Sequence, residues 1–226
     1  MLRKVAVWVY MKAHLWSSAL GQWLGWEWLT YNPLVKYSFD RAARRNAPKM
    51  ADAVLEEFPE LKRLADVGCG GGIFAAEFQT RGVNVVGCEY SATSRKLAEK
   101  RGVKTYPFDL SKSQSPLPGR PYQAVITLEV GEHIPELLAD SFASYLAATG
   151  DLIIFTAAQP GQGGHGHINE QPKSYWIEKF VRIGFCVDES ATGRVADRLR
   201  SLLAFSYLYN NLLILRKVAA NVGNSA

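Results

Sequence analysis

The sequence predicts an α/β fold: a seven-stranded, mostly parallel sheet with helices on both faces. Strand-like and helix-like segments alternate along most of the 226 residues, and crossovers of this length join parallel strands. A glycine turn, DVGCGGG (66–72), ends the first strand-like run and opens a helix. Hydrophobic residues make up 48% of the chain and charged residues 21%, which is a globular balance with enough apolar material for a sizeable core.

The predicted elements follow one another in a regular order. After a helix-like stretch that follows Pro33, residues 46–58 are predicted as a helix with Asn46 as its N-cap and Pro48 in its first turn. Apolar runs bounded by turn residues predict strands at 62–68, 83–90, 103–110, 122–129, 151–157, 185–190 and 210–218. Helices are predicted at 73–81, 93–101, 136–148 and 174–184. An amphipathic pattern over 193–209 adds a helix before the last strand.

The N-terminal segment differs in composition from the rest of the chain. Residues 1–29 hold five of the six tryptophans. Lys12 and His14 interrupt the apolar run and no small-residue cleavage site follows it, so we predict neither a signal peptide nor a membrane span. We predict that residues 1–46 form a helical lid on a catalytic domain at 47–220, or a helix on a membrane surface. Residues 221–226 are predicted to be a disordered tail.

Charge and cysteine content set limits on location and partners. The net charge of +5 permits an anionic partner without requiring one, and the basic residues are spread over several helix faces, which argues against RNA. The three cysteines form no CxxC pair and no zinc spacing, as expected for free thiols in a reducing compartment. We therefore predict a cytoplasmic protein, with membrane association through the N-terminal helix as an alternative. The sequence does not determine the oligomeric state.

The glycine turn alone leaves two kinds of ligand open. A triphosphate-binding loop would continue with Gly-Lys-Ser/Thr, but Ile73 and Phe74 follow Gly72. A dinucleotide is compatible with the loop, because 70–75 fits G-x-G-x-x-A and Glu89 stands at the right distance to bind a ribose. S-adenosylmethionine is the other compatible ligand.

The form D-x-G-x-G-x-G between a strand and a helix resembles the first motif of class I S-adenosylmethionine-dependent methyltransferases, which have a Rossmann-like sheet with a distinctive final strand. The resemblance covers about residues 51–218. It implies that Asp66 orients the amino end of the cofactor, that Glu89 binds the ribose hydroxyls and that Asp109 receives the adenine amino group. The cofactor-binding residues it implies are Asp66, Gly68, Cys69, Gly70, Gly72, Glu89, Tyr90, Asp109, Leu110 and Glu129.

The segment ITLEVGEHIPE (126–136) resembles the E-V-x-E-H segment of one subgroup of these enzymes, with Gly131 in place of the usual leucine. In ubiquinone-pathway O-methyltransferases and small-RNA 2′-O-methyltransferases, such a segment binds a divalent metal. The corresponding ligands here would be Glu129, Glu132, His133 and His167, but many enzymes with this segment bind no metal, and we do not expect one. In that case Glu129 lines the cofactor pocket and His133 braces the following helix.

These features together predict methyl transfer to a small molecule. We assign catalytic roles to His167, as general base or substrate contact, and to His133 and Glu129. Glycines at 161, 163, 164 and 166 predict a mobile gate, and the acceptor pocket is expected between this gate, the N-terminal helix and the 192–209 helix. The most favoured reaction is O-methylation of a partly apolar metabolite. A metal-assisted RNA 2′-O-methyltransferase and a non-catalytic methyltransferase-like binding protein are the alternatives.

Overall fold

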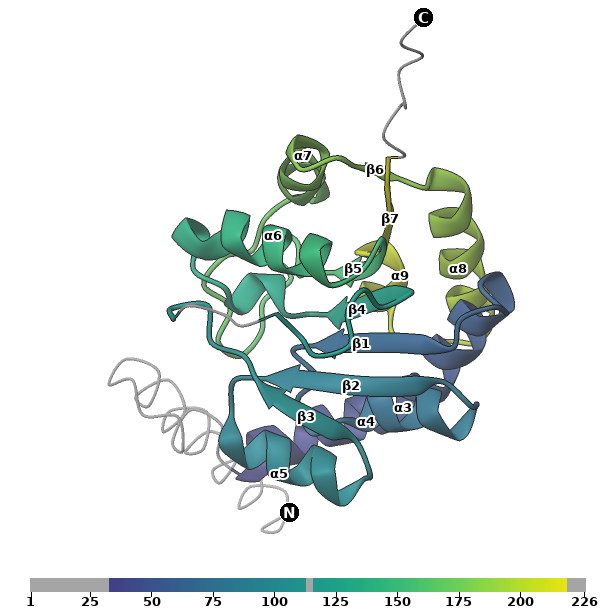
Figure 1. Ribbon diagram of the computed structural model, residues 1–226, viewed down its shortest axis with the longest axis vertical. Coiled ribbons are helices and arrows are strands. Elements are labelled where there is room, and N and C mark those ends of the chain that lie inside the picture. The colour runs from purple at the N-terminus through teal and green to yellow at the C-terminus, as the bar shows by residue number, and fades with distance from the viewer. Residues whose placement is uncertain (1–32, 113–115, 219–226) are drawn as a thin grey trace, which may run out of the picture.

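The computed structural model describes residues 33–112 and 116–218. The predicted seven-stranded sheet is present (Figure 1), in the order β3-β2-β1-β4-β5-β7-β6. Strand β7 runs antiparallel to β5 and β6, whereas the other neighbours pair in parallel. The strands are β1 (Arg63–Val67), β2 (Asn84–Glu89), β3 (Lys104–Pro107), β4 (Ala124–Leu128), β5 (Leu152–Thr156), β6 (Phe185–Val187) and β7 (Leu213–Lys217). Residues 1–32 of the predicted N-terminal lid (1–46) and the predicted tail over 221–226 lie outside the described residues.

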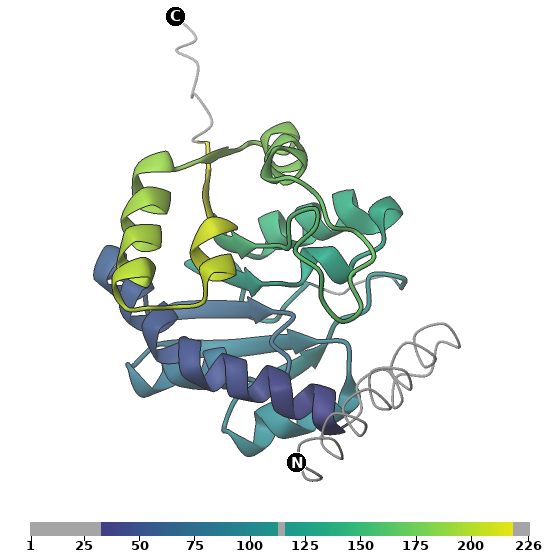
Figure 2. The same ribbon diagram turned by 180° about the vertical axis from the view of Figure 1, so that it is seen from behind.

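Helices cover both faces of this sheet (Figures 1 and 2). One face carries α3 (Pro33–Glu57), α4 (Ile73–Thr80), α5 (Ala92–Lys100), α8 (Glu189–Ser201) and α9 (Ser206–Asn210). The other carries α6 (Ala139–Thr149) and α7 (Lys173–Arg182). No helix in the described part of the chain is long and apolar enough to cross a bilayer.

The central strands contribute to two separate hydrophobic cores because successive side chains point to opposite faces. In β5, Leu152 and Ile154 join the core under α3 and α8, while Ile153 and Phe155 join the core under α6 and α7. Both faces are therefore apolar, which explains why the central strands read as continuous hydrophobic runs.

The first described helix corrects the sequence analysis. Helix α3 runs without interruption from Pro33 to Glu57, so Asn46 is not an N-cap and the domain boundary predicted after residue 46 falls inside a helix. Asn46 is fully buried, and its Oδ1 accepts a hydrogen bond from the Phe205 N–H at 2.9 Å. Its side chain therefore joins α3 to the segment between α8 and α9 instead of starting a helix.

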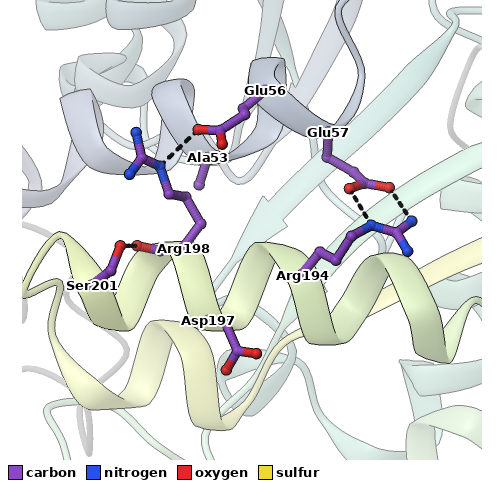
Figure 3. Close-up of a pocket in the computed structure, with 7 residues that line it drawn as sticks. All are labelled: Ala53, Glu56, Glu57, Arg194, Asp197, Arg198 and Ser201. Atoms are coloured by element: carbon purple, nitrogen blue, oxygen red, sulfur yellow. Dashed lines mark hydrogen bonds and ion pairs between the residues drawn. The ribbon is translucent and has the colours of Figure 1, made fainter.

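Two ion pairs join α3 to α8 (Figure 3). Glu57 pairs with Arg194, and Glu56 pairs with Arg198 at 2.7 Å. The arrowheads of β1, β2 and β4 point left in Figure 1, while α8 lies at the right. The contact between α3 and α8 therefore lies on the side away from the carboxyl ends of these strands, where parallel sheets bind ligands.

The last helical segment also differs from the prediction. The strand expected to reach residue 190 ends at Val187, because the Asp188 carboxylate accepts the Ala191 N–H at 2.9 Å and caps α8. The single helix expected over 193–209 is two helices, α8 and α9. They are separated at Leu203, which has a left-handed backbone (φ 56°).

Candidate functional site

The loop that follows β1, here the first glycine loop (residues 68–72), has a backbone that favours glycine. Gly68, Gly70 and Gly72 have φ values of 80°, 53° and 75°, in the left-handed region. A Cβ on Gly72 would lie 2.6 Å from the Ala98 Cβ and 2.9 Å from its Cα. At Gly70, by contrast, no atom lies within 4 Å of a Cβ position. The loop is thus closely packed against α5 at Gly72 but open at Gly70, where there is room for a ligand to approach the backbone.

Asp66 lies at the end of β1 beneath this loop. Its side chain is buried, and Oδ2 has no hydrogen-bond partner among the described residues. Burial, and then the nearby charge of Glu89, raise the pKa of Asp66 to about 7, against a partial offset from the Ala75 backbone hydrogen bond. A buried carboxyl with an unsatisfied oxygen suits a cationic ligand, because the cation would stabilise the ionised form.

Glu89 connects the end of β2 to the first glycine loop. Its Oε2 accepts the Gly70 N–H at 2.9 Å and its Oε1 accepts the Ser91 N–H at 2.7 Å. These two bonds hold the carboxylate at the carboxyl edge of the sheet, as the resemblance implies for a ribose ligand. A carboxylate oxygen can accept more than one hydrogen bond.

The other residues that the resemblance assigned to the cofactor surround this loop. Tyr90 is 60% exposed, so its ring is free to pack on a ligand. Asp109 lies past the end of β3 and accepts the Ser111 N–H at 3.1 Å, and the hydrogen bond from the Lys112 ammonium lowers the pKa of Asp109. Leu110 is partly buried beside it. Cys69 is buried, and its Sγ occupies the space that a Cβ on Gly87 would need. Burial raises the pKa of the Cys69 thiol.

Arg101 is a brace for the first glycine loop that the sequence analysis missed. It follows α5 and donates to the Gly71 carbonyl from Nη1 and to Asp40 Oδ2 from Nη2, the latter at 2.8 Å. The sequence showed Arg101 only as one of several basic residues near α5. Its contacts join α5, α3 and the loop.

Glu129 occupies an unusual backbone position at the end of β4. Its φ of 53° is left-handed, which is uncommon for a residue with a side chain and is associated with functional sites. Its Oε2 accepts from Gln162 Nε2 at 2.7 Å and its Oε1 from Asn211 Nδ2 at 3.1 Å. The Glu129 carboxylate is therefore held by two amides that lie far away in the sequence.

Glu132, His133 and His167 come together beyond the same strand. The Glu132 side chain is completely buried, and neither of its oxygens has a hydrogen-bond partner among the described residues. Burial and the charge of Glu129 raise its pKa to about 8. His167 Nε2 lies 3.8 Å from Glu132 Oε1, and the two histidine rings are perpendicular with centroids 5.1 Å apart.

His133 contacts the loop after β5, not the helix that we expected it to brace. Its Nδ1 lies 2.9 Å from the Gly166 carbonyl, which accepts only, so Nδ1 carries the proton. Burial lowers the pKa of His133 to about 4, and the ring is neutral at pH 7. The loop that it holds, residues 159–168, is called the second glycine loop below.

The cluster has a donor set suited to a divalent cation. Glu132, His133 and His167 each offer one ligand atom, and these atoms lie within 4.8 Å of one another. The unpartnered carboxylate of Glu132 fits such an ion, since a buried charge requires compensation. Glu129 is the exception among the four residues named from sequence, because its oxygens are bonded to Gln162 and Asn211.

Three further residues of this region were not identified from sequence: Gln162, Glu170 and Asn211. Glu170 stands three positions after His167, a spacing that could have drawn attention to it. Asn211 lies 82 positions from Glu129 in the sequence, and no local sequence pattern predicts their contact. The site at the end of β4 is thus assembled largely by long-range contacts.

Comparison with known proteins identifies a family for this chain. The family described as methyltransferase domain matches residues 39–202. The ubiquinone biosynthesis O-methyltransferase of Ruegeria sp. (strain TM1040) is 30% identical over 146 residues, which cover 63% of this chain and 51% of that protein. The protein of that name from Ruegeria pomeroyi is 32% identical over 117 residues, covering 50% and 44%. The chain therefore spans about half the length of these curated relatives.

Solved structures show the same fold at lower identity. Magnesium protoporphyrin IX methyltransferase from Synechocystis PCC 6803, with bound SAH, aligns with a TM-score of 0.56 at 18% identity, covering 76% of this chain and 86% of that one. A TehB-like SAM-dependent methyltransferase from Corynebacterium glutamicum aligns with a TM-score of 0.54 at 17% identity, covering 83% and 100%. Because the family match extends over most of the chain, we conclude that this protein belongs to the methyltransferase-domain family.

Proposed function

We propose that this enzyme methylates a hydroxyl group of a small, partly apolar molecule. The observation that carries the proposal is the buried Glu132 carboxylate facing His167 at the carboxyl end of β4. A hydroxyl acceptor must lose its proton during transfer, and this cluster offers groups that can take or stabilise it. The names of the relatives that share about 30% identity support the same class of reaction.

The first glycine loop and its neighbours would hold the cofactor. The open space above Gly70 would admit it, Glu89 would accept the ribose hydroxyls, and Asp66 would face its amino end. S-adenosylmethionine supplies a methyl group already activated on a sulfonium, so the protein has to orient the acceptor, exclude water and remove a proton.

His167 is the residue best suited to proton removal. Its Nδ1 contacts Glu170 at 2.7 Å, which leaves Nε2 directed toward Glu132. His133 is less suited to proton removal, because its low pKa makes the ring a weak base. We assign His133 to holding the second glycine loop through Gly166 and assign the base to His167.

A divalent cation is the alternative occupant of the same cluster, although the sequence did not lead us to expect one; with a cation bound, His167 Nε2 is a ligand and no longer the base. Glu132, His133 and His167 would hold it, and it would lower the pKa of a bound hydroxyl and orient the acceptor. Mixed carboxylate and imidazole ligands suit Mn²⁺ or Zn²⁺. Glu129 would remain outside this ligand set, with its carboxylate on Gln162 and Asn211.

Apolar groups near the cluster support a partly apolar acceptor. Leu137 is 84% exposed and Ile168 is 56% exposed, and they follow His133 and His167 closely in sequence. Tyr207 of α9 lies near Glu129, and burial together with that charge raises the pKa of Tyr207 to about 12. Helix α8 packs on α3, so we assign only α9, of the predicted 192–209 helix, to the acceptor side.

The test is a panel of acceptors with a labelled methyl donor. An alkyl phenol, an alkyl catechol, an alkyl amine and a short RNA are incubated with the protein, with and without a chelator and added Mn²⁺ or Zn²⁺. We expect label on the hydroxyl compounds, and loss of label in His167→Gln. Label only on the amine or the RNA would overturn the proposal. Loss of activity with chelator and its return with metal would establish the cation.

A further inference from the structure

Glu170 makes three contacts that converge on one carboxylate. Its Oε2 accepts the Gly161 N–H at 2.9 Å, and its Oε1 accepts the Gly163 N–H at 2.8 Å. The same Oε1 lies 2.7 Å from His167 Nδ1. Glu170 thus joins the outgoing limb of the second glycine loop to its returning limb, and nothing in the family match or the relatives assigns it a role.

The backbone of the loop is shaped for these contacts. Gly161 and Gly163 have φ values of 84° and 68°, which glycine adopts without steric cost. No atom lies within 4 Å of a Cβ at either position, so packing does not impose these conformations. At Gly164 a Cβ would collide with the His167 ring. The glycines thus allow two N–H groups to reach Glu170 and the imidazole to lie over the loop.

The contact between Glu170 and His167 determines which ring nitrogen is free. An ionised carboxylate only accepts, so the proton on the neutral ring resides on Nδ1 and the lone pair on Nε2. The two backbone N–H groups of Gly161 and Gly163 that point at Glu170 also require an accepting carboxylate there. Nε2 is the nitrogen that lies 3.8 Å from Glu132 Oε1, too far for a hydrogen bond but suited to a proton or cation between them.

We propose that Glu170 is the positioning residue of this site: its carboxylate selects the Nδ1–H form of His167, aims Nε2 at Glu132 and folds the second glycine loop around that arrangement. This inference rests on the proposed function of His167. The arrangement is a carboxylate–histidine pair of the kind that orients imidazoles at catalytic and metal sites. Glu170 touches neither acceptor nor cofactor in this role and acts through His167.

Glu170→Gln is the most informative variant. Glutamine keeps the length of the side chain but offers one accepting oxygen in place of two, and its NH₂ group opposes an N–H donor of the loop. Glu170→Asp keeps the charge but withdraws it by one methylene. Glu178→Gln is the matched control, because Glu178 is exposed on α7 and makes one long 3.8 Å pair with Arg182.

The first readout is the protonation form of His167, measured by ¹⁵N NMR of the four histidines. The natural sequence is expected to show His167 in a single Nδ1–H form near pH 8. Glu170→Gln should give a mixture of the two forms, whereas Glu178→Gln should leave the signal unchanged. An unchanged His167 signal in Glu170→Gln would overturn the proposal, whatever the activity.

The second readout separates this inference from the proposed function. Glu170→Gln should lower kcat by about 10- to 100-fold, while the affinity for S-adenosylmethionine, measured by calorimetry, stays within about twofold because the first glycine loop is intact. Glu170→Asp should recover part of the lost rate. If the NMR change occurs but no hydroxyl acceptor is methylated by any form, the positioning role stands and the proposed function fails. If kcat is unaffected in an active enzyme, the positioning role fails and the proposed function stands.

Discussion

The two glycine loops lie at the same edge of the sheet and both contain left-handed glycines, but different forces hold them. In the first, a side chain at Gly72 would meet the backbone of α5 at Ala98. In the second, the space around Gly161 and Gly163 is open, and a carboxylate binds their N–H groups. Close packing at Gly72 therefore constrains the first loop in addition to its hydrogen bonds with Glu89 and Arg101, whereas Gly161 and Gly163 of the second loop are held by hydrogen bonds without such packing. Substitutions at the two loops should accordingly differ in kind as well as size.

The largest expected effect is that of Gly72→Ala. The added Cβ would lie 2.9 Å from the Ala98 Cα, a backbone atom that cannot move away by a side-chain rotation. Gly72 also has a φ of 75°, in the left-handed region. Left-handed strain and overpacking together should lower the free energy of unfolding by about 2–5 kcal/mol. Urea unfolding of the cofactor-free protein measures this.

Gly70→Ala is the control for that experiment. Its φ of 53° brings similar strain, but no atom lies within 4 Å of the new Cβ. We expect a loss of only about 1–2 kcal/mol in stability, together with marked weakening of cofactor binding, because the Cβ would occupy the open space above the loop. Equal destabilisation by the two variants would show that packing at Gly72 does not constrain the first loop.

Glu89→Gln should affect binding more than folding. Glutamine would keep one acceptor but set an NH₂ group against the N–H of Gly70 or Ser91, and it removes the charge that favours ribose hydroxyls. The affinity for S-adenosylmethionine should fall about 10- to 100-fold, as for loss of a charge-assisted hydrogen bond. Calorimetry measures it, with the exposed Glu99→Gln of α5 as control. Unchanged affinity would remove Glu89 from the cofactor site.

Asp66→Asn should stabilise the cofactor-free protein in a pH-dependent way. The folded pKa of about 7 lies above the unfolded value of 3.8, so between these values the folded state holds the extra proton and stability falls as pH rises. The cost of the buried charge is complete above pH 7. The variant should therefore gain about 1–3 kcal/mol at pH 8 and much less at pH 5, while binding the cofactor more weakly. An equal gain at both pH values in urea unfolding would contradict this.

The same contrast between the loops explains what could be predicted from the sequence. Asp66, the three alternate glycines and Glu89 end neighbouring strands, so their meeting follows from strand alternation alone. The sequence analysis named Glu132, His133 and His167 together because the E-V-x-E-H resemblance indicated them, but it also included Glu129, whose carboxylate is bonded to Gln162 and Asn211 instead. The hydrogen bond from Asn211 to Glu129 could not be predicted, because it depends on the insertion of β7 between β5 and β6 in the sheet. The continuous helix through Asn46 was missed because its tertiary partner, Phe205, lies 159 positions away.

The smallest expected effect is that of Gly161→Ala in the second loop. Its φ of 84° imposes strain, but the position is open and the loop can adjust locally, so the free energy of unfolding should fall by about 1 kcal/mol at most. Cofactor affinity should not change, while kcat should fall a few-fold because the Gly161 N–H bond to Glu170 is distorted. Gly164→Ala sharpens the test, since its Cβ would displace the His167 ring and should lower kcat further at similar stability. If Gly161→Ala instead destabilised the protein as much as Gly72→Ala, both loops would be held by packing and the distinction between them would be wrong.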